Sequence, residues 1–108
     1  MHVGGSPYAF GFGTHAASFI TLPVPAKARL FHAKVGIDDE AKGGHVEFEV
    51  VVDGVSAWKS GPVDSGQEAL GCQITLNGAK ILELRVDALG VQDSDHADWL
   101  EPVFEVPE

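Results

Sequence analysis

The sequence predicts an all-β fold, an antiparallel β-sandwich, and three observations support this prediction. Apolar and polar residues alternate through several short runs, which is the side-chain period of a β-strand. No stretch sustains the spacing of an amphipathic helix, so at most a single helical turn is expected. The pairs Asp53-Gly54 and Asn77-Gly78 mark tight turns between such runs. Seven or eight short strands without a helix are expected to pack as two sheets.

Each expected strand is a run with period-2 alternation that turn residues or prolines close. The expected strands are residues 17–22, 28–37, 46–52, 55–59, 72–76, 82–88 and 99–106. Pro23-Val24-Pro25 ends the first strand because it removes two backbone donors. Residues 61–71 and 90–98 are expected to be loops. Pro102 interrupts the last strand, which indicates a strand at a sheet edge or a β-bulge.

Composition limits the classes of function that this chain can have. Its 108 residues and mass of 11.4 kDa predict a single domain over 1–108. The net charge of −9 argues against nucleic acid as a partner, because like charges repel. No apolar run is long enough for a membrane span, and the first residues lack the pattern of a signal peptide, so an export signal would lie outside this chain. Cys72 stands alone and is expected to be a buried thiol.

Clustered carboxylates follow two of the β-patterned runs, in segments 35–40 and 94–99. Such clusters are tolerated where water screens them or where a cation or a hydroxyl-rich ligand offsets their repulsion. The second segment adds an imidazole, His96, and an indole, Trp99. His96 and His15 are expected to lie in loops and are the better functional candidates among five histidines. Trp99 could stack on the apolar face of a sugar, or it could fill the end of the sandwich.

Several familiar motifs fail on inspection. Residues 11–16 match the Gly-x-Gly-x-x-Ala dinucleotide fingerprint, but a strand and two prolines follow where that fingerprint needs a helix. These glycines are expected to serve a tight loop. An EF-hand starting at Asp93 would need glycine and glutamate where Asp98 and Phe104 stand. Calcium could still bind an irregular set of oxygen ligands here, and a solvated acidic loop is the alternative. No catalytic residue set emerges, so the chain is not expected to be an enzyme.

Four blocks of the sequence, in this order and spacing, are similar to the NPCBM domain, which is related to carbohydrate-binding module family 51. The blocks are residues 8–16 (Tyr-Ala-Phe-Gly-Phe-Gly-Thr-His-Ala), 31–40 (Phe-His-Ala-Lys-Val-Gly-Ile-Asp-Asp-Glu), 50–54 (Val-Val-Val-Asp-Gly) and 95–99 (Asp-His-Ala-Asp-Trp). The resemblance departs from the family in two places. Family members usually carry a further strand and a tryptophan before the first block, and Leu100-Glu101-Pro102 replaces the small residues that commonly follow Asp-Trp.

This resemblance implies a jelly-roll β-sandwich of the galactose-binding-like type, often attached to glycoside hydrolases. It also implies a structural calcium ion, galactose-type ligands, and an extracellular or periplasmic location. We therefore expect a non-catalytic carbohydrate-binding module whose site lies in loops. In that site Trp99 would stack on the sugar ring, His15 and His96 would bond hydroxyls, and Asp38 would accept from another hydroxyl.

The expected calcium ligands are Asp39, Asp95 and Asp98. A second hypothesis belongs to another class of function. In it the same loops hold together a calcium-stabilised sandwich that mediates protein contact and binds no sugar.

Overall fold

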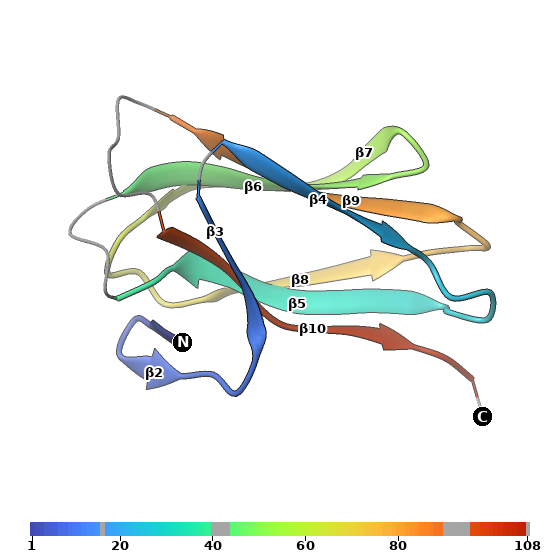
Figure 1. The fold of residues 1–108 in the computed structure, drawn as a ribbon, viewed down its shortest axis with the longest axis horizontal. Coiled ribbons are helices and arrows are strands. Elements are labelled where there is room, and N and C mark those ends of the chain that lie inside the picture. The colour runs from blue at the N-terminus through green and yellow to red at the C-terminus, as the bar shows by residue number, and fades with distance from the viewer. Residues whose placement is uncertain (16, 40–43, 90–95, 108) are drawn as a thin grey trace.

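The fold is a sandwich of two four-stranded antiparallel sheets, with a small two-stranded hairpin at one end (Figure 1). A computed structural model describes residues 1–15, 17–39, 44–89 and 96–107. Its strands are β1 (His2–Val3), β2 (Ser6–Pro7), β3 (Gly11–His15), β4 (Ser18–Pro23), β5 (Leu30–Ile37), β6 (His45–Val52), β7 (Val55–Asp64), β8 (Leu70–Thr75), β9 (Ile81–Ala88) and β10 (His96–Glu105). The first sheet has the order β3-β10-β5-β8 and the second β4-β9-β6-β7. The described residues contain no helix, membrane-spanning or otherwise, and the predicted all-β sandwich is confirmed.

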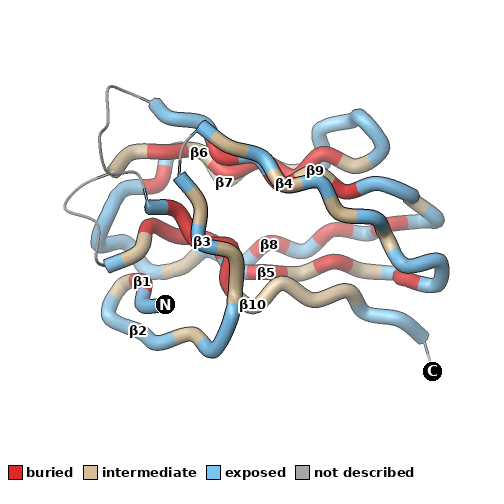
Figure 2. Tube along the Cα trace, viewed as in Figure 1, coloured by how far each residue is buried: buried red, intermediate tan, exposed pale blue. Residues whose placement is uncertain are grey.

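The core lies between the two sheets (Figure 2). In β5 the side chains of Phe31, Ala33, Val35 and Ile37 face it, as their alternation predicts. Cys72, on the neighbouring strand β8, is 3% exposed. Burial raises the pKa of this thiol to about 12, because desolvation disfavours the thiolate. The prediction of a buried thiol is therefore confirmed.

Several strands differ from expectation: β1, β2 and β3 were not expected, and β7, β8 and β10 reach into expected loops. β7 continues to Asp64, through Gly61-Pro62 in the segment expected to be a loop. That pair lies at a shift in the register between β7 and β6. Because β7 is an edge strand, its other side has no neighbouring strand, so the proline there removes no hydrogen bond to a second strand. β3 was not expected at all, because its glycines resemble a turn.

The chain makes the predicted turn at Asp53, which has a φ of 47°, followed by Gly54 with a φ of 84°. The Asp53 carboxylate also accepts hydrogen bonds from the backbone N–H groups of Lys80 (3.0 Å) and Ile81 (2.8 Å). These bonds join the β6–β7 turn to the start of β9. The bonds from Ile81 and Lys80 lower the pKa of this exposed carboxyl group below 3.8.

Strand β10 contains the irregularity that Pro102 predicts. Its pairing with β5 shifts between Leu100 and Val103, and Glu101 has a φ of 47°. Because β10 lies between β3 and β5, it is a central strand. The β-bulge interpretation is confirmed. The last pair of β10 with β3 is at Leu100, so Pro102 also lies where β10 has a paired neighbour on the β5 side alone, as the edge-position alternative expects.

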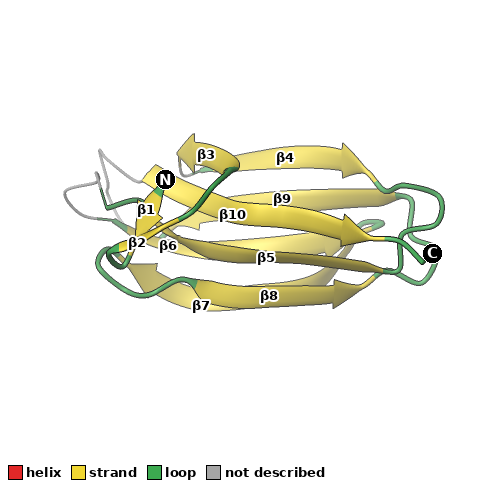
Figure 3. Cartoon of the chain, turned by 90° about the horizontal axis from the view of Figure 1, so that it is seen from below, coloured by secondary structure: helices red, strands yellow, loops and turns green. Residues whose placement is uncertain are grey.

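The hairpin of β1 and β2 crosses the outer face of the first sheet near one end (Figure 3). Gly4 and Gly5, with φ values of 58° and 84°, make the tight turn that joins its strands. Val3 packs on Gly36 of β5 so closely that a Cβ on Gly36 would lie 2.3 Å from Cγ1 of Val3. Leu100 is also fully buried, although it follows Trp99 and therefore points toward this outer face, away from the main core. The hairpin thus adds a third layer at this end of the sandwich.

Candidate functional site

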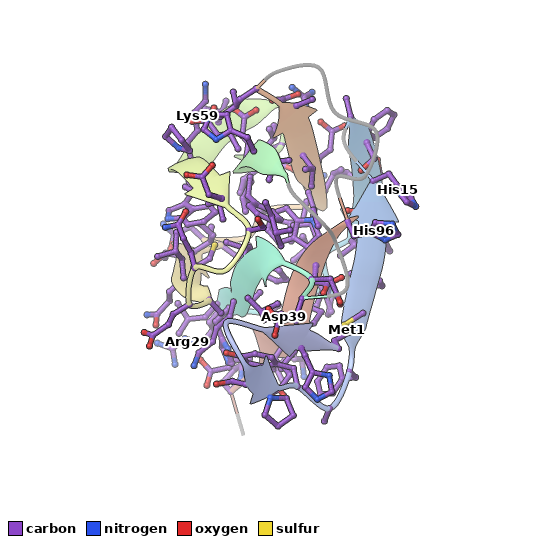
Figure 4. The ribbon with its side chains drawn as sticks, turned by 90° about the vertical axis from the view of Figure 1, so that its left-hand side faces the viewer. Met1, His15, Arg29, Asp39, Lys59 and His96 are labelled. Atoms are coloured by element: carbon purple, nitrogen blue, oxygen red, sulfur yellow. The ribbon has the colours of Figure 1, made fainter. Side chains whose placement is uncertain are left out.

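The best candidate site is a pair of histidines at the end of the sandwich where β3 ends and β10 begins. His15 and His96 are directly opposite each other in the antiparallel pairing of these strands. Their ring centroids are 4.4 Å apart, and the ring planes meet at 62°. Both side chains are exposed and lie together at one edge of this end of the molecule (Figure 4). The pair therefore exposes imidazole nitrogen atoms and aromatic ring faces to solvent at one place.

Bonds on both sides of β10 hold this pair in position. The Thr14 hydroxyl donates to the carbonyl of Ala97 (2.9 Å), and the N–H of Asp38 donates to the carbonyl of His96 (2.8 Å). The prediction that His15 and His96 lie in loops is wrong, because the strands extend further than the polar residues of 90–98 suggest. Alternation in His96-Ala97-Asp98-Trp99 was the signal that could have revealed the strand.

Asp38 and Asp39 follow directly after β5 and have different surroundings. Asp38 is partly exposed, next to His96 through its backbone bond. The carboxylate of Asp39 accepts from the N–H groups of Gly4 (3.0 Å) and Gly5 (2.8 Å), and its own N–H donates to the carbonyl of His2 (2.7 Å). Asp39 therefore anchors the N-terminal hairpin on the end of β5.

Asp98 is 3% exposed and lies on the outer side of β10, beneath the hairpin. In the pairing it stands between Gly13 of β3 and Gly36 of β5. A Cβ on Gly13 would lie 3.6 Å from Oδ1 of Asp98, and one on Gly11 would lie 2.3 Å from the carbonyl oxygen of Trp99. The interpretation of these glycines as a tight loop is wrong. They lie in β3, and at Gly11 the absence of a side chain permits close contact with β10.

Trp99 is fully buried in the core, where its ring meets Phe48 edge to face at a centroid distance of 5.2 Å and an angle of 88°. A buried indole cannot stack on a sugar from solvent. The proposed stacking role of Trp99 is therefore wrong, and its alternative role of filling the sandwich is confirmed. The reason is that Trp99 and Ala97 point inward from β10, whereas His96 and Asp98 point outward.

The expected calcium ligands are only partly described. Asp95 lies outside the described residues, whereas Asp39 anchors the hairpin and Asp98 lies beneath it. Among the residues with described positions, no three His, Cys, Asp or Glu side chains form a group that could hold a metal ion. The donor chemistry of these aspartates suits calcium, which binds oxygen ligands in flexible geometry. Each carboxylate oxygen has more than one acceptor position, so the Asp39 bonds do not exclude a further ligand.

The fold and this site define a small β-sandwich module with an exposed, polar site at one end. The sequence profile of the NPCBM/NEW2 domain matches residues 1–105, and the chain belongs to this family. The family contains carbohydrate-binding modules, so this chain is a carbohydrate-binding module by family.

The relatives and structural neighbours agree with this assignment. Alpha-1,3-galactosidase B of Akkermansia muciniphila is 40% identical over 106 residues, which cover 94% of this chain and 13% of that enzyme. The CBM51 of Clostridium perfringens GH95, in complex with methyl-galactose, has a TM-score of 0.86 and 27% identity, and the match covers 93% of this chain and 72% of that chain. The C. perfringens ZmpB structure with its M60 catalytic domain and two CBM51 domains has a TM-score of 0.84 and 29% identity, covering 92% and 11% of the two chains. This chain thus spans a small part of the curated enzyme that it resembles.

Proposed function

We propose that this chain is a non-catalytic module that binds a galactose-type glycan at the His15–His96 pair. The observation that carries the proposal is the exposed imidazole pair at the end of a fold that also occurs in a module complexed with methyl-galactose. The name of the A. muciniphila relative, an α-1,3-galactosidase, supports the same class of sugar. Fold alone would not be enough, because sandwiches of this kind serve many functions.

The proposed mechanism uses the imidazoles in two ways. Each neutral ring carries one donor and one acceptor nitrogen, which match the hydroxyl groups of a pyranose. The rings also offer the exposed aromatic faces that Trp99, being buried, cannot supply. Asp38 would accept from a further hydroxyl. A site that competes with water for every hydrogen bond is expected to bind with a dissociation constant of roughly micromolar to millimolar, about −8 to −4 kcal/mol.

We propose that the buried residues at this end of the sandwich, Trp99 above all, fix the position of the exposed His15–His96 pair. Trp99 packs β10 against the core, and the bonds from Thr14 and Asp38 fix the start of that strand. A preorganised site loses less conformational entropy when it binds, so a weak ligand keeps more of its interaction free energy. A rigid, exposed pair of this kind can bind a ligand without any catalytic group.

In a parent protein, such a module would hold a catalytic domain close to galactose-bearing glycans. The glycoside hydrolase names among its relatives and neighbours support this role, and with it a location outside the cytoplasm. Linking a binding domain to an enzyme raises the effective concentration of enzyme at the glycan without new contacts in the active site.

A structural calcium ion is a second part of the proposal. It would be bound by Asp39, Asp95 and Asp98, and its charge would offset part of the net charge of −9 at an end that already holds several carboxylates. When bound, calcium would fix the strand ends relative to one another. The contacts to the sugar would come from His15, His96 and Asp38, and none from the calcium ion.

A glycan array tests the proposed function. The 108-residue chain, the variant His15→Ala/His96→Ala and the control His45→Ala are applied to glycans with terminal galactose, glucose, mannose and fucose. Binding to galactose-terminated glycans is expected for the wild type and the control, and is expected to be lost in the double variant. If the wild type binds no glycan, with or without calcium, the proposed function is wrong and the protein-contact hypothesis replaces it.

A further inference from the structure

A groove of about 700 Å³ lies on the outer face of the first sheet, away from the histidine pair. Its floor is formed by β10, β5 and β8, and one wall is the segment Tyr8–Phe10, which leads from the hairpin into β3. Figure 3 shows these three strands continuing past the hairpin, which covers only one end of the face. The volume is within the range of small-ligand sites.

The groove combines aromatic rings with groups that form hydrogen bonds. Phe10 is 53% exposed, a large value for an aromatic ring that lines a groove. Lys34 places its ammonium group 5.9 Å from the centre of the Tyr8 ring, which holds this donor at the wall. His32 and Gln73, paired across β5 and β8, add donors and acceptors on the floor.

The wall of the groove is fixed to its floor by the bulge in β10. The N–H of Glu101 donates to the carbonyl of Phe10 (2.9 Å), and the Glu101 carboxylate accepts from the N–H of Ala9 (3.0 Å). Glu101 has a φ of 47°, a conformation that is costly for most residues other than glycine and that concentrates at functional positions. The exposed Phe10 ring is therefore carried by a backbone segment that is bonded at two points.

Charge narrows the class of ligand. The groove contains one lysine, Lys34, and two glutamates, Glu101 and Glu105, so it carries no excess positive charge to attract an acid. An aromatic ring beside balanced donors and acceptors suits a pyranose, which has an apolar face and a rim of hydroxyl groups. A peptide strand would need an open sheet edge, whereas this is the face of a sheet.

From these observations we infer that the groove is a second glycan subsite, which takes one pyranose unit of a neutral oligosaccharide. Phe10 stacks on the sugar ring, while Lys34, Gln73 and Glu101 bond its hydroxyls. The inference rests on the proposed function, because it assumes that the ligand is a glycan. The proposed function places one sugar at the histidine pair. The inference adds a second binding surface, the groove on the outer face of the first sheet.

The test uses lacto-N-neotetraose, a neutral tetrasaccharide with terminal galactose, its sialylated form and methyl galactoside. Two-dimensional NMR follows the side-chain amide of Gln73 and the imidazole of His32 as reporters of the groove, and His15 and His96 as reporters of the end site. We expect the neutral tetrasaccharide to shift the Gln73 and His32 signals at saturation. We expect the sialylated form to bind the groove several-fold more weakly.

Two phenylalanine variants provide a matched comparison. Phe10→Ala is expected to weaken binding at the groove about tenfold or more, whereas Phe19→Ala, at a 67% exposed phenylalanine on the other sheet, leaves it unchanged. Unchanged melting temperatures show that both variants fold. Groove signals that stay still in the wild type, equal effects of the two variants, or tighter binding of the sialylated sugar would each overturn the inference. Groove signals that still shift in His15→Ala/His96→Ala would show that the groove binds independently of the end site. End-site signals that shift without any groove signal would overturn the inference and leave the proposed function standing.

Discussion

His96 and Trp99 are three residues apart in one strand, yet they have opposite roles. The imidazole of His96 is exposed and meets His15 across the strands, whereas the indole of Trp99 is fully buried against Phe48. Between them, Ala97 joins the core and Asp98 lies beneath the N-terminal hairpin. One short motif thus contains both a candidate binding surface and the packing that supports it. The residues of this motif therefore cannot all be assigned to ligand contact.

The largest expected effect is on the buried side of this comparison. Trp99→Ala should lower the free energy of unfolding by roughly 3–5 kcal/mol, because it removes a large buried ring and leaves a cavity beside Phe48. Urea denaturation measures the change. Trp58→Ala, at a partly buried tryptophan on the edge strand β7, should cost less. A loss below about 1 kcal/mol for Trp99→Ala would mean that its ring is not part of the core.

Calcium should have the next largest effect if Asp39, Asp95 and Asp98 bind it. At one hundred times its dissociation constant, an ion that binds only the folded chain stabilises it by about 2.7 kcal/mol. Differential scanning calorimetry in calcium and then in excess chelator measures this. The variant Asp95→Asn should reduce the difference. Equal melting temperatures in both conditions, with no metal found by elemental analysis, would show that these residues hold no calcium.

Substitution of the exposed His96 should weaken binding and leave the stability of the fold almost unchanged. His96→Ala should weaken binding of methyl galactoside about tenfold or more, which corresponds to about 1.4 kcal/mol, since it removes hydrogen bonds and an aromatic face. Calorimetry of binding and thermal unfolding are measured on the same samples. His45→Ala, at a histidine paired with Asp64 on the other sheet, should leave binding unchanged. A fall in melting temperature equal to that of Trp99→Ala would show that His96 is structural.

Asp39 should matter for the hairpin and little for the sandwich. Asp39→Ala removes the acceptor of the Gly4 and Gly5 N–H groups, at a cost of about 1 kcal/mol. Hydrogen exchange should become faster at Gly4 and Gly5 and should stay slow in the paired amides of β5. If exchange at the hairpin is unaffected, Val3 packed on Gly36 is enough to hold it.

The smallest effect concerns Asp53, whose pKa is lowered by bonds from Ile81 and Lys80. A carboxyl group with a lower pKa in the folded state than in the unfolded state stabilises the fold above its unfolded value, about 4. That contribution is lost as the pH falls through the lowered folded value. Stability measured between pH 6 and pH 2 should decline less in Asp53→Asn than in the wild type. Parallel curves would assign the acid sensitivity to other carboxylates.

Much of the fold could be predicted because alternation decides which strand faces are buried. Phe31, Val35 and Leu84 reach the core as expected, and the turn at Asp53-Gly54 forms. The site was harder to predict because polar residues at strand ends resemble loops. His15 and His96 do lie in one region, as the sequence predicts, but their direct pairing depends on the register of β3 with β10. Neither that register nor the groove behind Phe10 follows from local sequence, since both depend on contacts between distant segments.

One measurement tests the central claim most directly, because the imidazole signals of the His15–His96 pair and of the other histidines can be followed separately. Imidazole NMR signals are followed while the chain is titrated with methyl galactoside. The signals of His15 and His96 should shift together along one binding curve, while that of His45, on the other sheet, stays in place. A saturable shift at His45 without any at His15 and His96, or no shift at any histidine at millimolar sugar, would contradict the account.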